Sequence, residues 1–221
     1  MTTAAQIRKL TKPLLERYPD LVLDGQWLHL KPTNHLLRTL LFDRTGQANY
    51  FRPRWATIIL FDPRSIVDLK YGEKLAGPRG QLWSWDDPNM PADIYDVIDN
   101  VALPAMRKVK SIDDFVKFAS SSERFPLRVL PAFPHLKLLT DAATGDLESA
   151  RSICNKWCGR APFDPEDPLG PIVDGLCPAL ASNNVPALVR QLHAWEEYTV
   201  KQLKLEKIWE RTPFPIELRV D

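Results

Sequence analysis

Hydrophobic residues near the N-terminus recur at steps of three and four, which is the spacing of one face of a helix. Pro13 stands inside this stretch and has no backbone N–H, so we expect it to kink or restart the helix. We therefore predict an N-terminal helix whose apolar face is formed by Ile7, Leu10, Leu14 and Tyr18.

Short runs of aromatic and branched residues follow, separated by turn-forming residues, and these runs predict β-strands. They cover 27–31, 36–42 and 50–61, and 81–85 adds a fourth. Arg44-Thr-Gly-Gln47 supplies the glycine that a hairpin turn favours. The second and third strands are therefore expected to pair as antiparallel neighbours.

The apolar period becomes helical after Pro91, which suits a first helical turn, and Pro104 stands near the expected end of that helix. Ser111-Ile-Asp-Asp114 then resembles a capping box with the shorter acidic residue in place of glutamate. Everything beyond this point is typical of helices and proline-rich connections. The apolar positions of the first of these helices are Ile94, Val97, Ile98 and Val101.

These patterns predict an α+β fold, with a small, mostly antiparallel sheet and helices in the N-terminal half and a helical C-terminal half. We place a mixed domain at 1–125 and a helical region at 126–221, with the change of pattern falling within 109–130. The helical region is expected to contain two helical hairpins joined by a proline-rich segment. Its last helix is expected to run from about Val185 to Glu210.

The helical half contains an internal similarity at an offset of 38 residues, found by aligning Thr144-Gly-Asp-Leu147 with Ser182-Asn-Asn-Val185. Each copy offers one amphipathic helix after the aligned turn, which indicates a helical hairpin. A true repeat and two unrelated amphipathic helices both explain the pattern. The corresponding pairs are Leu138 and Leu176, Ala150 and Leu188, Cys154 and Leu192, and Trp157 and Trp195.

Composition adds little to this picture. The 221 residues carry 29 Lys and Arg against 28 Asp and Glu, so the overall basic charge of a nucleic-acid-binding protein is absent. No apolar run approaches the ~20 residues that span a bilayer, and Met1–Leu10 has no hydrophobic signal core, so we expect a cytoplasmic protein. In that compartment the three cysteines are expected to be reduced thiols.

Proline stands at every third position from Pro162 to Pro171, which aligns the rings on one edge of a polyproline II helix. This segment is interpreted as a stiff surface linker, with a ligand for an aromatic-lined groove as the alternative.

Four polar residues are candidates for a catalytic site: His35, Arg38, Asp86 and Asp87. A histidine at a strand entrance can act as a base, and paired carboxylates can bind a cation or exchange a proton. The alternatives are a positioning or surface histidine and turn-forming aspartates.

Arg52, Arg54 and Trp55 are candidate binding residues, because arginines mixed with aromatic rings hold single-stranded nucleic acid. Neighbouring strand residues face opposite sides of a sheet, so the arginines can equally solvate one face while the aromatic rings fill the other.

Cys154, Cys158, Cys177 and His193 could supply four soft ligands for zinc, but the usual spacing of paired ligands is not repeated. Buried thiols are therefore favoured and no metal is expected. The chain has neither a glycine-rich phosphate loop nor a nucleophile elbow, so we expect no cofactor and assign no catalytic motif.

The order of helix and strands through Leu14–Tyr18, Trp27–Arg38 and Trp55–Pro63 resembles small bacterial domains of unknown function that occur among polymorphic-toxin immunity proteins. The resemblance covers about the first 125 residues. It implies a compact mixed domain whose surface serves a protein partner, and it supplies no catalytic residues.

The leading hypothesis is a noncatalytic intracellular protein, immunity-like or adaptor-like, that binds another protein through its helical hairpins or its sheet. The alternative is a hydrolase or nucleic-acid-processing enzyme with His35, Arg38, Asp86 and Asp87 at one sheet edge. The partner is expected to be a protein rather than nucleic acid or a membrane, and the sequence does not indicate an oligomeric state.

Overall fold

The computed structural model describes residues 2–64, 67–121, 130, 133–157 and 169–219. The chain forms two compact units. The first comprises Met1–Ile58 and Asp68–Lys110, and the second comprises Ile59–Val67 and Ser111–Asp221. The first unit ends at Lys110, and the segment after the longest strand belongs to the helical unit.

An antiparallel sheet organises the first unit, and the predicted α+β class is confirmed. Its strand order is β1-β2-β3-β4-β5, and β6 pairs with β4 beside β5. The strands are β1 (Leu21–Asp24), β2 (Trp27–Leu30), β3 (Leu36–Arg44), β4 (Tyr50–Ile59), β5 (Gly72–Lys74) and β6 (Trp83–Ser84).

A tight hairpin joins β1 to β2, with Asp24 opposite Trp27. Gly25 occupies its turn with φ +58°, a conformation that glycine adopts without steric cost. The sequence prediction missed β1, although Asp24-Gly25 is a recognised hairpin signal.

The strand β3 lies at the centre of the sheet and is buried on both faces from Leu36 to Phe42. The first half of β4 alternates instead, with Phe51 and Trp55 buried and Arg52 exposed. The core of this unit therefore gathers around β3 and the buried side of β4.

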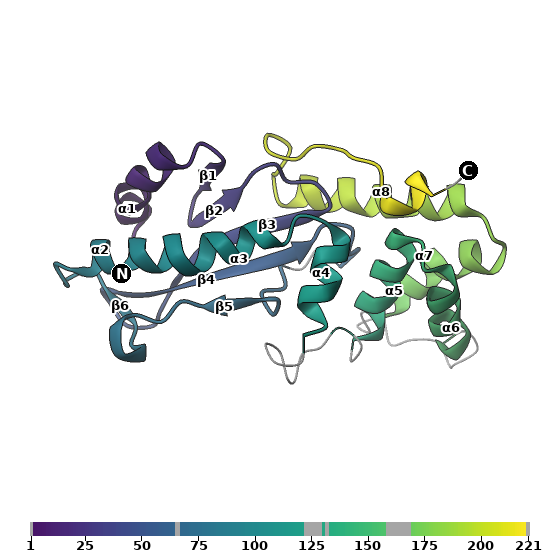
Figure 1. The fold of residues 1–221 in the computed structure, drawn as a ribbon, viewed down its shortest axis with the longest axis horizontal. Coiled ribbons are helices and arrows are strands. Elements are labelled where there is room, and N and C mark those ends of the chain that lie inside the picture. The colour runs from purple at the N-terminus through teal and green to yellow at the C-terminus, as the bar shows by residue number, and fades with distance from the viewer. Residues whose placement is uncertain (1, 65–66, 122–129, 131–132, 158–168, 220–221) are drawn as a thin grey trace. The chain divides into compact units, whose positions relative to one another are not determined.

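Two helical elements accompany the sheet (Figure 1). The first, α1 (Ala4–Arg17), begins with a capping box between Thr3 and Gln6 and runs through Pro13 without restarting. The second consists of α2 (Met90–Val97), a π-helical turn (Ile98–Ala102) and α3 (Leu103–Lys108).

Pro104 lies in the first turn of α3, four residues before this helical stretch ends at Lys108. Proline cannot donate a hydrogen bond to the preceding turn. The wider π turn lies directly before it, which allows the helix to continue to Lys108.

The second unit is helical. The predicted capping box at Ser111 and Asp114 is present and starts α4, with both reciprocal hydrogen bonds at 3.1 Å. The helices are α4 (Ile112–Ala119), α5 (Pro134–Thr144), α6 (Leu147–Trp157), α7 (Gly170–Ala181), α8 (Val185–Gln202) and the short 3-10 helix η4 (Pro215–Leu218).

Two helical hairpins, α5–α6 and α7–α8, form most of this unit (Figure 1). Their second helices begin at Leu147 and Val185, the offset that the sequence alignment predicts. Ala150 and Leu188 are buried at corresponding positions. Gly175 allows α7 to approach α8 closely, because a Cβ atom there would lie 2.4 Å from the Trp195 ring.

The last long helix ends at Gln202, so the predicted extension to Glu210 is wrong. Lys204 adopts φ +55°, and the amide of Leu205 donates to the carbonyl of Val200 at 2.9 Å. These features form a left-handed helix cap, which stops α8.

Among the described residues, no helix is long and apolar enough to cross a membrane. Most of the proline-rich segment lies outside the described residues. Its last proline, Pro171, stands in the first turn of α7.

Candidate functional site

The four catalytic candidates do not form one site. His35 and Arg38 lie where β3 begins, whereas Asp86 and Asp87 follow β6, which pairs with the first residues of β4. The start of β3 lies beside the end of β4 in an antiparallel sheet. The two pairs therefore lie toward opposite ends of the nine-residue strand β3, roughly 20 to 30 Å apart at ~3.4 Å per residue.

The aspartate pair acts as a turn former. The Asp86 carboxylate accepts a hydrogen bond from the Asn49 side chain at 3.1 Å, and the Asp87 carboxylate accepts one from the backbone N–H of Asn89 at 2.9 Å. Both aspartates are exposed and lie just before α2. These contacts account for the pair without a cation.

The candidate nucleic-acid residues lie on opposite faces of β4. Arg52 is exposed and Arg54 is half-buried on one face, whereas Trp55 is fully buried on the other. A buried indole cannot stack on a base. The strand β4 therefore does not present Trp55 and the two arginines on one surface. Tyr50, 38% exposed at the start of the strand, is the accessible ring nearest to the arginines in sequence.

Arg38 is a buried cation. It is 8% exposed, and its guanidinium donates to the carbonyl of Pro32 at 2.5 Å. Burial lowers the pKa of Arg38, and the nearby charge of Asp20 opposes that effect. The neighbouring His35 is 9% exposed. Neither side chain is on the open surface, so the alternative of a surface histidine does not describe His35.

The cysteines differ from the prediction of reduced thiols, because Cys154 on α6 and Cys177 on α7 form a disulfide. These two sulfur atoms are therefore bonded to each other and are not available as zinc ligands. Cys158 lies outside the described residues, so the proposed four-ligand set cannot be placed as a whole.

His193, the fourth proposed ligand, contacts Glu217, Phe214 and Glu196. Its Nε2 lies 2.8 Å from the Glu217 carboxylate, and its ring packs 4.7 Å from the Phe214 ring. The same Glu217 oxygen accepts a hydrogen bond from the Phe214 backbone N–H at 2.7 Å. The buried Glu196 lies 3.6 Å from Nδ1. This cluster attaches η4 to α8.

A polar cluster also joins α5 to α6. The Lys137 ammonium contacts the Asp141 carboxylate at 2.5 Å and the Ser149 hydroxyl at 2.9 Å, and that hydroxyl donates to Asp141 at 2.6 Å. A serine next to a lysine can be a nucleophile with its base. Here the carboxylate holds the charged ammonium, which has no lone pair to accept a proton. The cluster connects α5 to α6 through hydrogen bonds.

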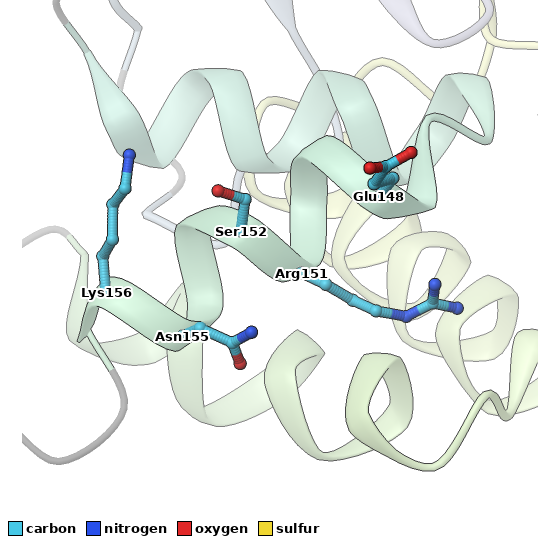
Figure 2. A pocket seen from close by; sticks show the side chains of 5 residues that line it. All are labelled: Glu148, Arg151, Ser152, Asn155 and Lys156. Atoms are coloured by element: carbon cyan, nitrogen blue, oxygen red, sulfur yellow. The ribbon is translucent and has the colours of Figure 1, made fainter.

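The outer face of α6 carries a depression of about 460 Å³. Among the described residues, its lining comes from this one helix, and Figure 2 shows the Arg151 and Lys156 side chains pointing in different directions. The described part of the depression therefore extends along the helix surface. The lining residues are Glu148, Arg151, Ser152, Asn155 and Lys156.

Arg151 is the most constrained of these residues. Its Nε donates to the carbonyl of Leu180 at 3.1 Å, and its terminal nitrogen contacts the Asn183 side chain. Both acceptors are neutral and lie at the end of α7, and together they hold the guanidinium in one orientation. The sequence signal for this surface was the polar side of the α6 stripe, which the sequence interpretation left unused.

No family model, curated protein or solved structure matches this chain.

Proposed function

We propose that this protein is a noncatalytic binding protein that holds another protein on the outer face of α6. The observation that carries this proposal is the polar depression, which extends along the exposed side of α6 and contains a fixed arginine. Preorganised side chains lose little conformational entropy when they bind, so such a surface suits recognition. An immunity-like or adaptor-like role in the cytoplasm fits this mode of action.

The charges of α6 indicate the chemistry of the partner. Glu148 stands at one end of the depression and Lys156 at the other, eight residues and therefore ~12 Å apart along the helix. A complementary segment carries a cation opposite Glu148 and a carboxylate opposite Lys156. Charges at the rim of an interface mainly set orientation and association rate.

The enzyme alternative has less support. Its four candidate residues lie at two ends of the sheet, and a catalytic base must stand within hydrogen-bond reach of the proton it removes. Nucleic-acid binding through β4 is likewise left with arginines on one face and the buried Trp55 on the other.

The proposal is tested with the full-length chain as bait in its native cell, using quantitative mass spectrometry of the recovered proteins. Asn155→Arg adds a bulky cation in the depression without touching the disulfide. Gln202→Arg makes the same change at an exposed position at the end of α8 and serves as the matched control.

We expect a partner that is recovered in stoichiometric amount with the wild type and with Gln202→Arg, and that is reduced at least tenfold by Asn155→Arg, which corresponds to about 1.4 kcal/mol. Recovery of no such partner at several salt concentrations would contradict the proposal. Equal recovery with both variants would also contradict it.

A further inference from the structure

Arg38 makes few hydrogen bonds for a buried charged side chain. A guanidinium carries five N–H donors, and within the described part of the chain one of them is engaged, by the Pro32 carbonyl. Burial of a charge is costly unless the charge is paired. Arg38 keeps 8% of its surface exposed to solvent.

The nearest opposite charge is already engaged. Asp20 contacts Arg107 through both carboxylate oxygens, at 2.9 and 3.2 Å, and its charge also acts on Arg38. The backbone N–H of Lys31 donates to the Asp20 carbonyl at 2.8 Å, which fixes Asp20 beside the end of β2. Asp20 is therefore ion-paired with Arg107, and Arg38 has the charge of the same carboxylate nearby without a direct ion pair to it.

A second polar group at this end of the sheet is also incomplete. The Thr33 hydroxyl is fully buried, and the residues described by the structure offer it no hydrogen-bond partner. Buried polar groups are nearly always hydrogen-bonded, to ordered water or an ion where the protein supplies nothing. Thr33 follows directly on Pro32, the residue whose carbonyl holds Arg38.

We propose that Arg38 and Arg107 form a binding site for a small oxyanion beside Asp20. A phosphate or carboxylate group supplies the second negative charge that two guanidinium groups require, and its oxygen atoms match their planar donors. The low exposure of Arg38 favours a small anion over a bulky one. This site belongs to the first unit and is independent of the α6 surface.

The test measures binding of inorganic phosphate and, in a separate arm, of acetate by isothermal titration calorimetry, against chloride at equal ionic strength. Asp20→Asn removes the competing carboxylate and is expected to tighten binding roughly fivefold. Asp99→Asn is the matched control, because Asp99 is paired with Arg17 at 2.7 Å in the same unit. It is expected to leave the affinity unchanged.

Arg38→Gln is expected to abolish binding of both anions. If that variant does not fold, the comparison of Asp20→Asn with Asp99→Asn decides alone, since both variants keep the two site arginines. The arm that binds more tightly identifies phosphate or carboxylate as the preferred group. The proposal is overturned if neither anion binds the wild type up to about 50 mM, well beyond the millimolar affinity of a weak site. It is also overturned if Arg38→Gln binds as the wild type does, or if Asp20→Asn and Asp99→Asn behave alike.

Discussion

His29 is an imidazole held inside the sheet. It lies on β2 opposite Thr39, is 4% exposed, and stacks on the Trp27 ring with 6.4 Å between the centroids. Its Nδ1 has no hydrogen-bond partner among the described residues. Burial lowers the pKa of His29 from 6.5 to about 4, although the charge of Asp24 opposes this shift.

This shift predicts acid destabilisation in a defined window. Between pH 6.5 and about 4 the unfolded chain binds a proton at His29 that the folded chain does not, so the free energy of unfolding falls as the pH falls through this range. The loss approaches ~3 kcal/mol at the lower end. Urea denaturation of the wild type and of His29→Gln measures it. An equally steep pH dependence in His29→Gln would contradict the assignment.

Residue environments could be predicted from the sequence only where a local period determines them. The alternation of Arg52 and Trp55 on β4 is such a case, since period two assigns them to opposite faces. The burial of Arg38 follows instead from the place of β3 between β2 and β4 in the sheet. No local pattern could have revealed it.

The helix α8 is shorter than its apolar pattern indicated because its end is determined by one residue. Lys204 occupies the left-handed region that follows many helices, at φ +55°. A non-glycine residue is strained there by roughly 1 kcal/mol. The sequence offers no glycine at this point, so the usual stop signal was missing.

Lys204→Gly is therefore expected to raise the free energy of unfolding by about 0.5 to 1 kcal/mol, through relief of that strain. The same substitution at Lys201, inside α8, is expected to lower it by a similar amount. Thermal denaturation of both variants measures the difference. Destabilisation by both would show that the α8 cap is not formed as described.

The disulfide between α6 and α7 predicts a redox-dependent stability of the hairpins. The bond closes a loop with a sequence separation of 23 residues. Replacing both cysteines by serine is expected to cost ~3 kcal/mol of stability in oxidising buffer and much less in reducing buffer. Peptide mapping without reductant should recover the peptides of Cys154 and Cys177 joined to each other. Complete alkylation of both without reductant would contradict the bond.

Elements with strong patterns were predictable, and those formed by tertiary pairing were not. The starts of α6 and α8 follow from the aligned turns at Leu147 and Val185. The strand β5 has no apolar run and exists through its pairing with β4. Gly72 permits that pairing, because a Cβ atom there would lie 1.9 Å from the Trp55 carbonyl oxygen.

The two units are not consecutive halves of the chain. The segment Ile59–Val67 leaves the sheet and joins the helical unit, where Phe61 packs edge-on against Phe214 at 5.2 Å. The Thr199 hydroxyl donates to the carbonyl of Asp62 at 3.3 Å. A division by sequence pattern alone gives one linear boundary, so it could not detect this return of the chain.

Phe61→Ala in the full chain is therefore expected to destabilise the helical unit by roughly 3 to 5 kcal/mol, the cost of removing a buried aromatic ring. Amide hydrogen exchange should show faster exchange in α8. Tyr198→Ala on the same helix, which removes a ring that is 52% exposed, should have a small effect. Unchanged exchange in Phe61→Ala would show that the segment does not stabilise this unit.

The most direct test of the binding proposal is hydrogen exchange of the full chain with and without the partner recovered from the cell. We predict that the partner protects the amides of α6, Leu147–Trp157, and that Glu148→Lys combined with Lys156→Glu reduces this protection. Protection confined to the sheet, or no protection in either unit, would contradict the assignment of α6 as the binding surface.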